Sequence, residues 1–152
     1  MNKIVLVSLV IATSFIAGAR SAEKKGTNNM PSKLSAKDIA GATFKHKDAQ
    51  KYKVEGRGVI DFTSLVSNDK KFATGMYKAG ASQENFLDEV YGVDEFMYFI
   101  TGSVTLTSED GTVQVINAGE AVSIPADWKG TWDTEGYTKI WVIYSKDGSA
   151  LE

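Results

Sequence analysis

Residues 94–132 hold the feature that most constrains the fold, which is a pair of short apolar runs joined by a hairpin. The first run ends at Gly102, and the second begins after Gly119. Between them lies Asp110-Gly111, a dipeptide that favours a tight two-residue hairpin turn. Such runs, bounded by turn residues, are typical of antiparallel strands. The segment therefore predicts paired strands at the centre of the fold.

The same pattern of short runs and glycine or aspartate turns extends over much of the chain. Roughly nine such runs follow one another closely, with almost no helix, so the sequence predicts an all-β sandwich or closed barrel. The predicted strands cover residues 59–66, 71–79, 83–91, 95–100, 104–107, 112–116, 121–124, 130–134 and 139–144. Gly75 falls inside one of them and predicts a bulge or a close backbone approach.

The first 21 residues read as a secretory signal peptide. Met1-Asn2-Lys3 supplies a positive start, residues 4–17 are almost wholly apolar, and small residues follow. The apolar run is shorter than the roughly 20 residues that a membrane-spanning helix needs. We therefore expect the mature chain to begin between Arg20 and Ala22 and the protein to be periplasmic or secreted. Membrane attachment is expected only if the signal stays uncleaved.

Charge separates a basic arm, residues 22–57, from the predicted barrel, residues 58–152. The arm holds nine Lys or Arg against four Asp or Glu, whereas the barrel holds six against fifteen. An acidic barrel is a poor partner for phosphate backbones, so no binding of nucleic acid is expected. Within the arm, Ser35 and Asp38 resemble a capping box and predict a short helix over residues 36–40.

Two residue types that often carry out chemistry are scarce. The chain has no cysteine, which excludes disulfides, thiolate metal sites and a cysteine nucleophile. It has one histidine, so any site that needs two imidazoles from one chain is excluded as well. This histidine, His46, lies between Lys45 and Lys47, and we expect it to be exposed to solvent rather than to act as a ligand.

Two motifs in the central segment resemble those of cupins, a family of small antiparallel β-barrels. Glu95, six residues and Gly102 match the end of the first cupin motif, and Gly119, five residues and Pro125 match the start of the second. The resemblance implies a jelly-roll-like cupin barrel. Residues 125–132 are also similar to the ureidoglycine aminohydrolase-like branch, which typically reads Pro-Ala-Gly-aromatic-x-Gly-Thr-Trp. Here Asp127 replaces the glycine of that pattern.

The resemblance also implies a metal site whose histidines this sequence lacks. Metal-binding cupins carry two histidines six and four residues before the glutamate, and a third in the second motif. Those positions are Glu89, Tyr91 and Gly130 here, or Asp88 and Val90 for the first two with the alternative spacing. Imidazoles suit Mn, Fe or Zn, whereas carboxylates and a phenol would bind a hard divalent cation only weakly. We therefore expect no resident metal or other cofactor, which removes the basis for a manganese-dependent aminohydrolase activity.

The predicted pocket lies inside the barrel. Period-two alternation places Glu95 on the inner face of its strand, and we expect Glu89 to point the same way unless Gly92 shifts the register by one residue. Neighbouring carboxylates raise each other's pKa, so such a pair can work as acid and base. An indole offers a flat surface for a sugar, a ring or a cationic amine. The candidate catalytic residues are Glu95 and Glu89, and the candidate binding residues are Tyr91, Met97, Trp128 and Trp132.

Three functions are compatible with these residues. The first is metal-free binding of a small polar or cationic molecule by an exported barrel. The second is a small-molecule enzyme, such as an aminohydrolase, isomerase or lyase, that uses Glu95 and Glu89 as acid and base. The third is a structural module that forms homodimers through its outer strands, for which the apolar residues 140–144 are suited.

Overall fold

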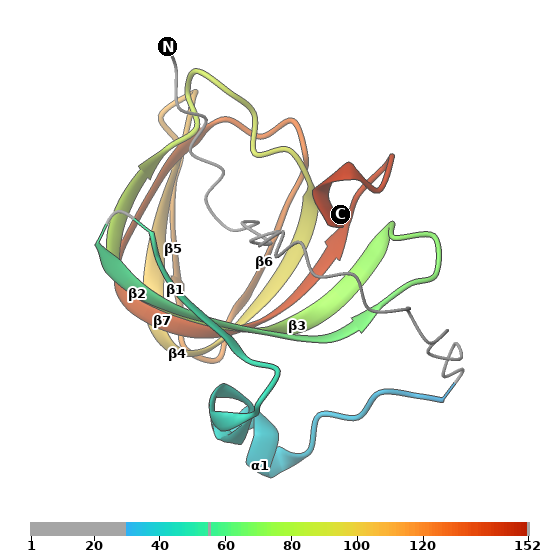
Figure 1. Ribbon diagram of the computed structural model, residues 1–152. Helices are drawn as coiled ribbons and strands as arrows, with labels where there is room; N and C mark the ends of the chain where they lie inside the picture. Colours follow the sequence, from blue (N-terminus) through green and yellow to red (C-terminus); the bar gives the residue numbers. More distant parts are fainter. Residues whose placement is uncertain (1–29, 55, 152) are drawn as a thin grey trace.

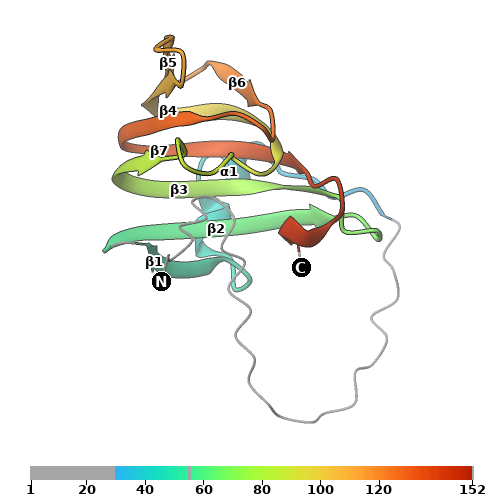
Figure 2. The ribbon, with the colours of Figure 1, turned by 90° about the horizontal axis from the view of Figure 1, so that it is seen from above.

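The computed structural model describes residues 30–54 and 56–151, so the predicted signal peptide lies outside the described residues. Seven strands form one antiparallel sheet in the order β1-β2-β3-β7-β4-β5, with β6 also paired to β4. Figure 1 shows this sheet curved into a trough, and Figure 2 shows β4, β7, β3, β2 and β1 one below another from top to bottom. The strands are β1 (Gln50–Val54), β2 (Arg57–Val66), β3 (Phe72–Asn85), β4 (Asp94–Ser108), β5 (Val113–Asn117), β6 (Ala121–Ile124) and β7 (Gly130–Tyr144).

Three strands are longer than the sequence predicts, because glycines that look like turns are bends inside continuous strands. Residues 71–79 and 83–91 were expected as two strands, but β3 runs unbroken from Phe72 to Asn85. The same holds for β4 and β7, each of which replaces two expected strands. The expectation of nine short strands is therefore wrong, and so is a strand over residues 86–91, which form a loop.

The bends coincide at three glycines on neighbouring strands. Gly80 pairs with Gly136, and Gly136 in turn pairs with Ser103, the residue after Gly102. Gly102 and Gly136 have φ values of 75° and 122°, in the left-handed region that favours glycine. A Cβ at Gly102 would overlap the carbonyl oxygen of Gly136. This line of glycines lets the sheet fold over on itself while its hydrogen-bonded ladder continues.

The N-terminal arm packs on the outside of the trough and contributes to the sheet. Its helix α1 (Ala36–Ile39) has the predicted capping box, with Ser35 and Asp38 each accepting from the other's backbone N–H. The 3-10 helix η1 (Ala42–Lys45) follows, with Thr43 and Phe44 buried and the Thr43 hydroxyl 3.4 Å from the Met76 sulfur. The sheet begins before the expected boundary at residue 58, since β1 pairs along its length with β2.

The inner face of the sheet follows strict alternation where the strands are straight. In β4, Glu95, Met97 and Phe99 are buried and the residues between them are exposed, while beyond the bend the buried residues are Val104 and Leu106. The close approach predicted at Gly75 is confirmed, because a Cβ there would overlap the Trp141 ring and the carbonyl of Phe62. The Asp110-Gly111 turn joins β4 to β5 as predicted. A second 3-10 helix, η2 (Ser149–Leu151), closes the described part of the chain. Within residues 30–54 and 56–151, no helix has the length and apolar character needed to cross a membrane.

Candidate functional site

Glu95 lies on the inner face of β4, as the alternation predicts, and two partners hold its carboxylate there. Its Oε1 accepts a hydrogen bond from the Lys139 ammonium over 2.7 Å, and its Oε2 accepts one from the Tyr91 hydroxyl. The side chains of Glu95 and Lys139 are each 1% exposed. A charge so fully removed from water is tolerated only when it is paired and hydrogen-bonded. The three residues therefore form one interdependent unit.

Lys139 is the partner of Glu95 that sequence reasoning missed. Its Nζ also lies 2.9 Å from the Met97 sulfur. The ammonium is 5.4 to 5.8 Å from the ring centroids of three aromatic residues, within the range of cation–π attraction. Those rings belong to Tyr77, Trp132 and Tyr137. The signal was present in the sequence, because period-two alternation back from Trp141 places Lys139 on the inner face of β7.

Most of the candidate residues lie together in the barrel interior, whereas Trp128 and Glu89 do not. Tyr91, Met97 and Trp132 are buried together with Glu95 in the barrel core. Trp128 is half-buried, and its indole N–H donates to the Ser108 hydroxyl over 3.0 Å. Its ring packs against Tyr91 at 6.1 Å between centroids, so it supports the site from behind.

Glu89 does not join the interior group. The expectation that it points into the barrel beside Glu95 is wrong, because β3 ends at Asn85 and Glu89 lies exposed in the following loop. Alternation cannot be extended across a loop, so the strand register that the expectation assumed is lost at this point. The pair of facing carboxylates from Glu89 and Glu95 therefore does not exist in this structure.

A second buried ion pair joins Arg57 to Glu84. The Arg57 Nη1 donates to the Glu84 carboxylate, and the two side chains are 8% and 3% exposed. Glu84 also accepts a hydrogen bond from the Ser82 hydroxyl over 3.0 Å. Sequence reasoning missed both partners, since it placed Arg57 in the basic arm. For Glu84 the signal was its alternation with Phe86, which is also buried.

The two ion pairs influence each other electrostatically. Burial raises the pKa of Glu84, while the charges of Arg57 and Lys139 oppose that shift. Burial also raises the pKa of the Tyr77 hydroxyl to about 12 and that of Tyr137 well above its ordinary value. The phenols therefore stay neutral at physiological pH and line the site as hydrogen-bonding groups rather than as charges.

Asp61, on β2, is a buried carboxyl with a raised pKa. Burial raises the pKa of its carboxyl to about 6, and the negative charge of Glu95 adds to the shift. The Trp141 indole N–H, which donates to Oδ1 over 3.3 Å, and the Lys139 charge partly oppose it. An aspartate with a pKa raised in the folded state favours folding when protonated, and this contribution disappears as the pH rises through about 6.

We expect Asp61→Asn to stabilise the protein at pH 7.5 and to have little effect at pH 4.5. Asn keeps an oxygen acceptor for the Trp141 N–H but carries no buried negative charge, so a gain of about 2 kcal/mol is expected above pH 6. Urea unfolding at both pH values measures it. Asp88→Asn, at an exposed loop position, is the matched control and should change stability by less than about 0.5 kcal/mol. An Asp61→Asn effect equal at both pH values would refute the titration of this carboxyl.

The donor set inside the barrel does not fit a transition metal. Among the described residues, no three His, Cys, Asp or Glu side chains are grouped so that they could hold a metal ion. Glu95 already binds an ammonium and a phenol, and a second cation beside Lys139 would meet its positive charge. His46 lies outside, with its ring 5.3 Å from that of Phe62, and its predicted exposure is confirmed.

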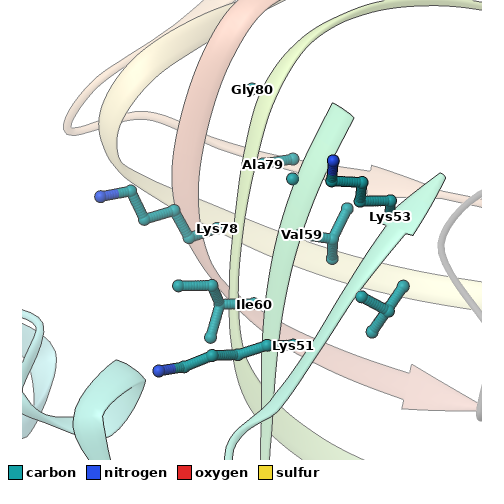
Figure 3. A pocket seen from close by; sticks show the side chains of 9 residues that line it. Lys51, Lys53, Val59, Ile60, Lys78, Ala79 and Gly80 are labelled. Atoms are coloured by element: carbon teal, nitrogen blue, oxygen red, sulfur yellow. The ribbon is translucent and has the colours of Figure 1, made fainter. Parts of the chain in front are cut away.

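A separate hollow of about 510 Å³ lies on the surface of β1, β2 and β3. Figure 3 shows the side chains of Lys51, Ile60 and Lys78 extending to the same side of these strands. This order follows the strand register, in which Ile60 pairs with both lysines. The exposed lysines rim an apolar floor, and the buried ion pairs described above do not line it.

Comparisons with known proteins agree with this architecture. A family model described as the EutQ-like cupin domain matches residues 66–139. Among curated proteins, none matches the sequence significantly.

Three solved structures share the fold at low sequence identity. The EutQ protein of Clostridium difficile is 19% identical over 66% of this chain and 78% of its own, with a TM-score of 0.51. Ectoine synthase from P. lautus is 16% identical over 68% and 72%, with a TM-score of 0.52. A protein of unknown function from Rhizobium leguminosarum is 20% identical over 76% and 98%, also with a TM-score of 0.52. Likeness at these identities concerns the fold alone. Together with the domain match over residues 66–139, it leads to one conclusion: this chain has a cupin fold.

Proposed function

We propose that this chain is an exported, metal-free cupin whose barrel interior binds a small polar molecule. The observation that carries the proposal is the Lys139–Glu95 pair. Glu95 is the glutamate of the first cupin motif, and the ammonium 2.7 Å from its carboxylate supplies the positive charge that a metal ion would supply in a metal-binding cupin. Export is proposed from the sequence of residues 1–21, which reads as a signal peptide.

The internal lysine changes which ligand the interior favours. An isolated carboxylate would attract a cationic amine, but Glu95 is already neutralised by Lys139. A second cation would pay for desolvation without an unpaired negative partner. Neutral or acceptor-rich molecules fit better, because the ammonium and phenolic groups are hydrogen-bond donors. The rings of Phe99, Trp132 and Tyr137, with centroids 5.3 to 6.4 Å apart, supply an apolar wall beside them.

The other two functions have less support from the geometry. The enzyme hypothesis loses its second carboxylate, because Glu89 lies outside the barrel. The ureidoglycine aminohydrolase-like branch and a homodimer stay predictions. For the homodimer, the outward residues of the predicted interface include Tyr144, which is 46% exposed beside Phe96 at 44%. Exposed aromatic side chains of this kind are common at interfaces between subunits.

Titration of the intrinsic tryptophan fluorescence with small sugars, amino acids, carboxylates, amides and amines tests the proposal. We expect at least one class to change the emission of the wild type, and Trp132→Phe to abolish that change. Trp128→Phe is the matched control, since its indole lies behind the site, and the response should persist in it. A folded wild-type protein that responds to none of these compounds, or a response that survives Trp132→Phe combined with Trp141→Phe, would contradict binding in the barrel interior.

A further inference from the structure

The ion pair with Glu84 engages only one of the three guanidinium nitrogens of Arg57. Arg57 is the first residue of β2, and its Nη1 donates to Glu84. Its Nε and Nη2 are buried and have no hydrogen-bond partner among the described residues. An N–H donor that is buried without an acceptor costs about 1–3 kcal/mol, so native structures seldom leave one unmatched without a reason. Two such donors on one side chain need an explanation.

The two unused donors are a matched pair. In a planar guanidinium, the Nε–H and one Nη2–H lie parallel along the same edge, and this edge is the one that grips both oxygens of a carboxylate. Glu84 takes the Nη1 side, and the Tyr77 hydroxyl also interacts with the guanidinium, but neither Nε nor Nη2 makes a hydrogen bond within the described residues. Because the Ser82 hydroxyl also fixes the Glu84 carboxylate, the guanidinium is held in place before any ligand arrives, which lowers the entropic cost of binding.

Trp132 supplies a third unused donor close to the same carboxylate. Its Nε1 is buried without a partner among the described residues. Trp132 lies directly opposite Glu84 in the pairing of β3 with β7, at which separation cross-strand side chains touch. Glu84 is therefore bonded by Arg57 of β2 and paired with Trp132 of β7. The Lys139 ammonium, 5.4 Å from the Trp132 ring centroid, adds positive charge to the same region.

We infer that the barrel interior takes a small carboxylate, with the two carboxylate oxygens on the Nε and Nη2 edge of Arg57 and the Trp132 indole N–H beside them. The inference rests on the proposed function, since it names the ligand class of that interior. The chemistry is recognition only, with no covalent step. A planar anion with two syn oxygens is required, so the site discriminates against a neutral amide of the same shape, which would place an NH₂ group against an N–H donor.

The test uses acetate, malonate and succinate at constant ionic strength, with acetamide and malonamide as neutral counterparts, on the full chain at pH 7.5. We expect at least one carboxylate to raise the unfolding temperature and to shift the Trp132 indole N–H resonance, and the amides to do neither. Arg57→Lys keeps the charge that Glu84 needs but lacks the two-donor edge, so we expect the apparent Kd to rise by about tenfold or more. Trp132→Phe, which keeps an aromatic ring, should weaken binding by a smaller factor.

The outcomes separate this inference from the proposed function. If amides and carboxylates bind equally, or if Arg57→Lys folds and binds carboxylates as tightly as the wild type, the ligand class is wrong while the barrel still binds small molecules. If neither class of probe affects the protein, the inference is contradicted, while the proposed function is decided by the titration with the wider set of compounds. Should Arg57→Lys fail to fold, the comparison of acetate with acetamide on the wild type decides the matter alone.

Discussion

Lys139→Met is expected to destabilise the protein by about 3–5 kcal/mol, because it leaves the Glu95 carboxylate buried without its partner. Met matches the length of the lysine stem and fills the same space among the aromatic rings, so loss of packing contributes little. The remaining Tyr91 hydroxyl satisfies one oxygen of Glu95 but not its charge. Urea unfolding at pH 7 measures the loss.

The double variant Lys139→Met with Glu95→Gln tests whether the loss of stability comes from the unpaired Glu95 charge. It removes both charges and keeps an acceptor for the Tyr91 hydroxyl, so we expect it to be more stable than the Lys139→Met single variant. Buried ion pairs that are replaced together by neutral side chains often cost little. Lys78→Met is the matched control, since this lysine is exposed on β3, and its effect should stay within about 0.5 kcal/mol. Equal stability of Lys139→Met and the wild type would contradict a buried, paired lysine.

Gly102→Ala is expected to cost about 3 kcal/mol or more, or to prevent folding. The residue has a φ of 75°, where a side chain adds strain of about 1–3 kcal/mol. The new methyl group would also overlap the backbone carbonyl of Gly136 on β7. Relief of this overlap would require β4 and β7 to separate at the bend of the trough. Thermal unfolding, or solubility on expression if the variant does not fold, measures the effect.

Gly111→Ala isolates the conformational part of that cost. Gly111 has a similar φ of 84°, but a Cβ there meets nothing within 4 Å. We expect this variant to lose only about 1 kcal/mol, because strain is present without a clash. If the two alanine variants were equally destabilised, the account of the glycine line as a point of close strand contact would be wrong.

The predictions from sequence succeeded where a signal is local. The inward direction of Glu95 follows from alternation over one straight strand, and the capping box at Ser35 from two residues three positions apart. The Asp110-Gly111 turn is likewise set by its own two residues. These features need no knowledge of distant parts of the chain, which is why the pattern predicts them.

The predictions failed where one segment depends on another. Gly80, Gly102 and Gly136 each look like the end of a strand, and only their alignment across three strands makes them a shared bend. Arg57 lies 27 residues before its partner Glu84, and Lys139 lies 44 residues after Glu95. Nothing near any of these residues indicates that its charge will be neutralised. Long-range pairing of this kind is decided by register, and one sequence does not specify it.

Metal content is the measurement that tests the central claim most directly, which is that the chain's own Lys139 takes the place of a metal ion beside Glu95. The protein would be purified without chelators from cells supplied with manganese, iron and zinc, and analysed with its Glu95→Gln variant. We predict substoichiometric metal in both proteins, with no difference between them. One transition-metal ion per chain in the wild type, lost in Glu95→Gln, would contradict the account.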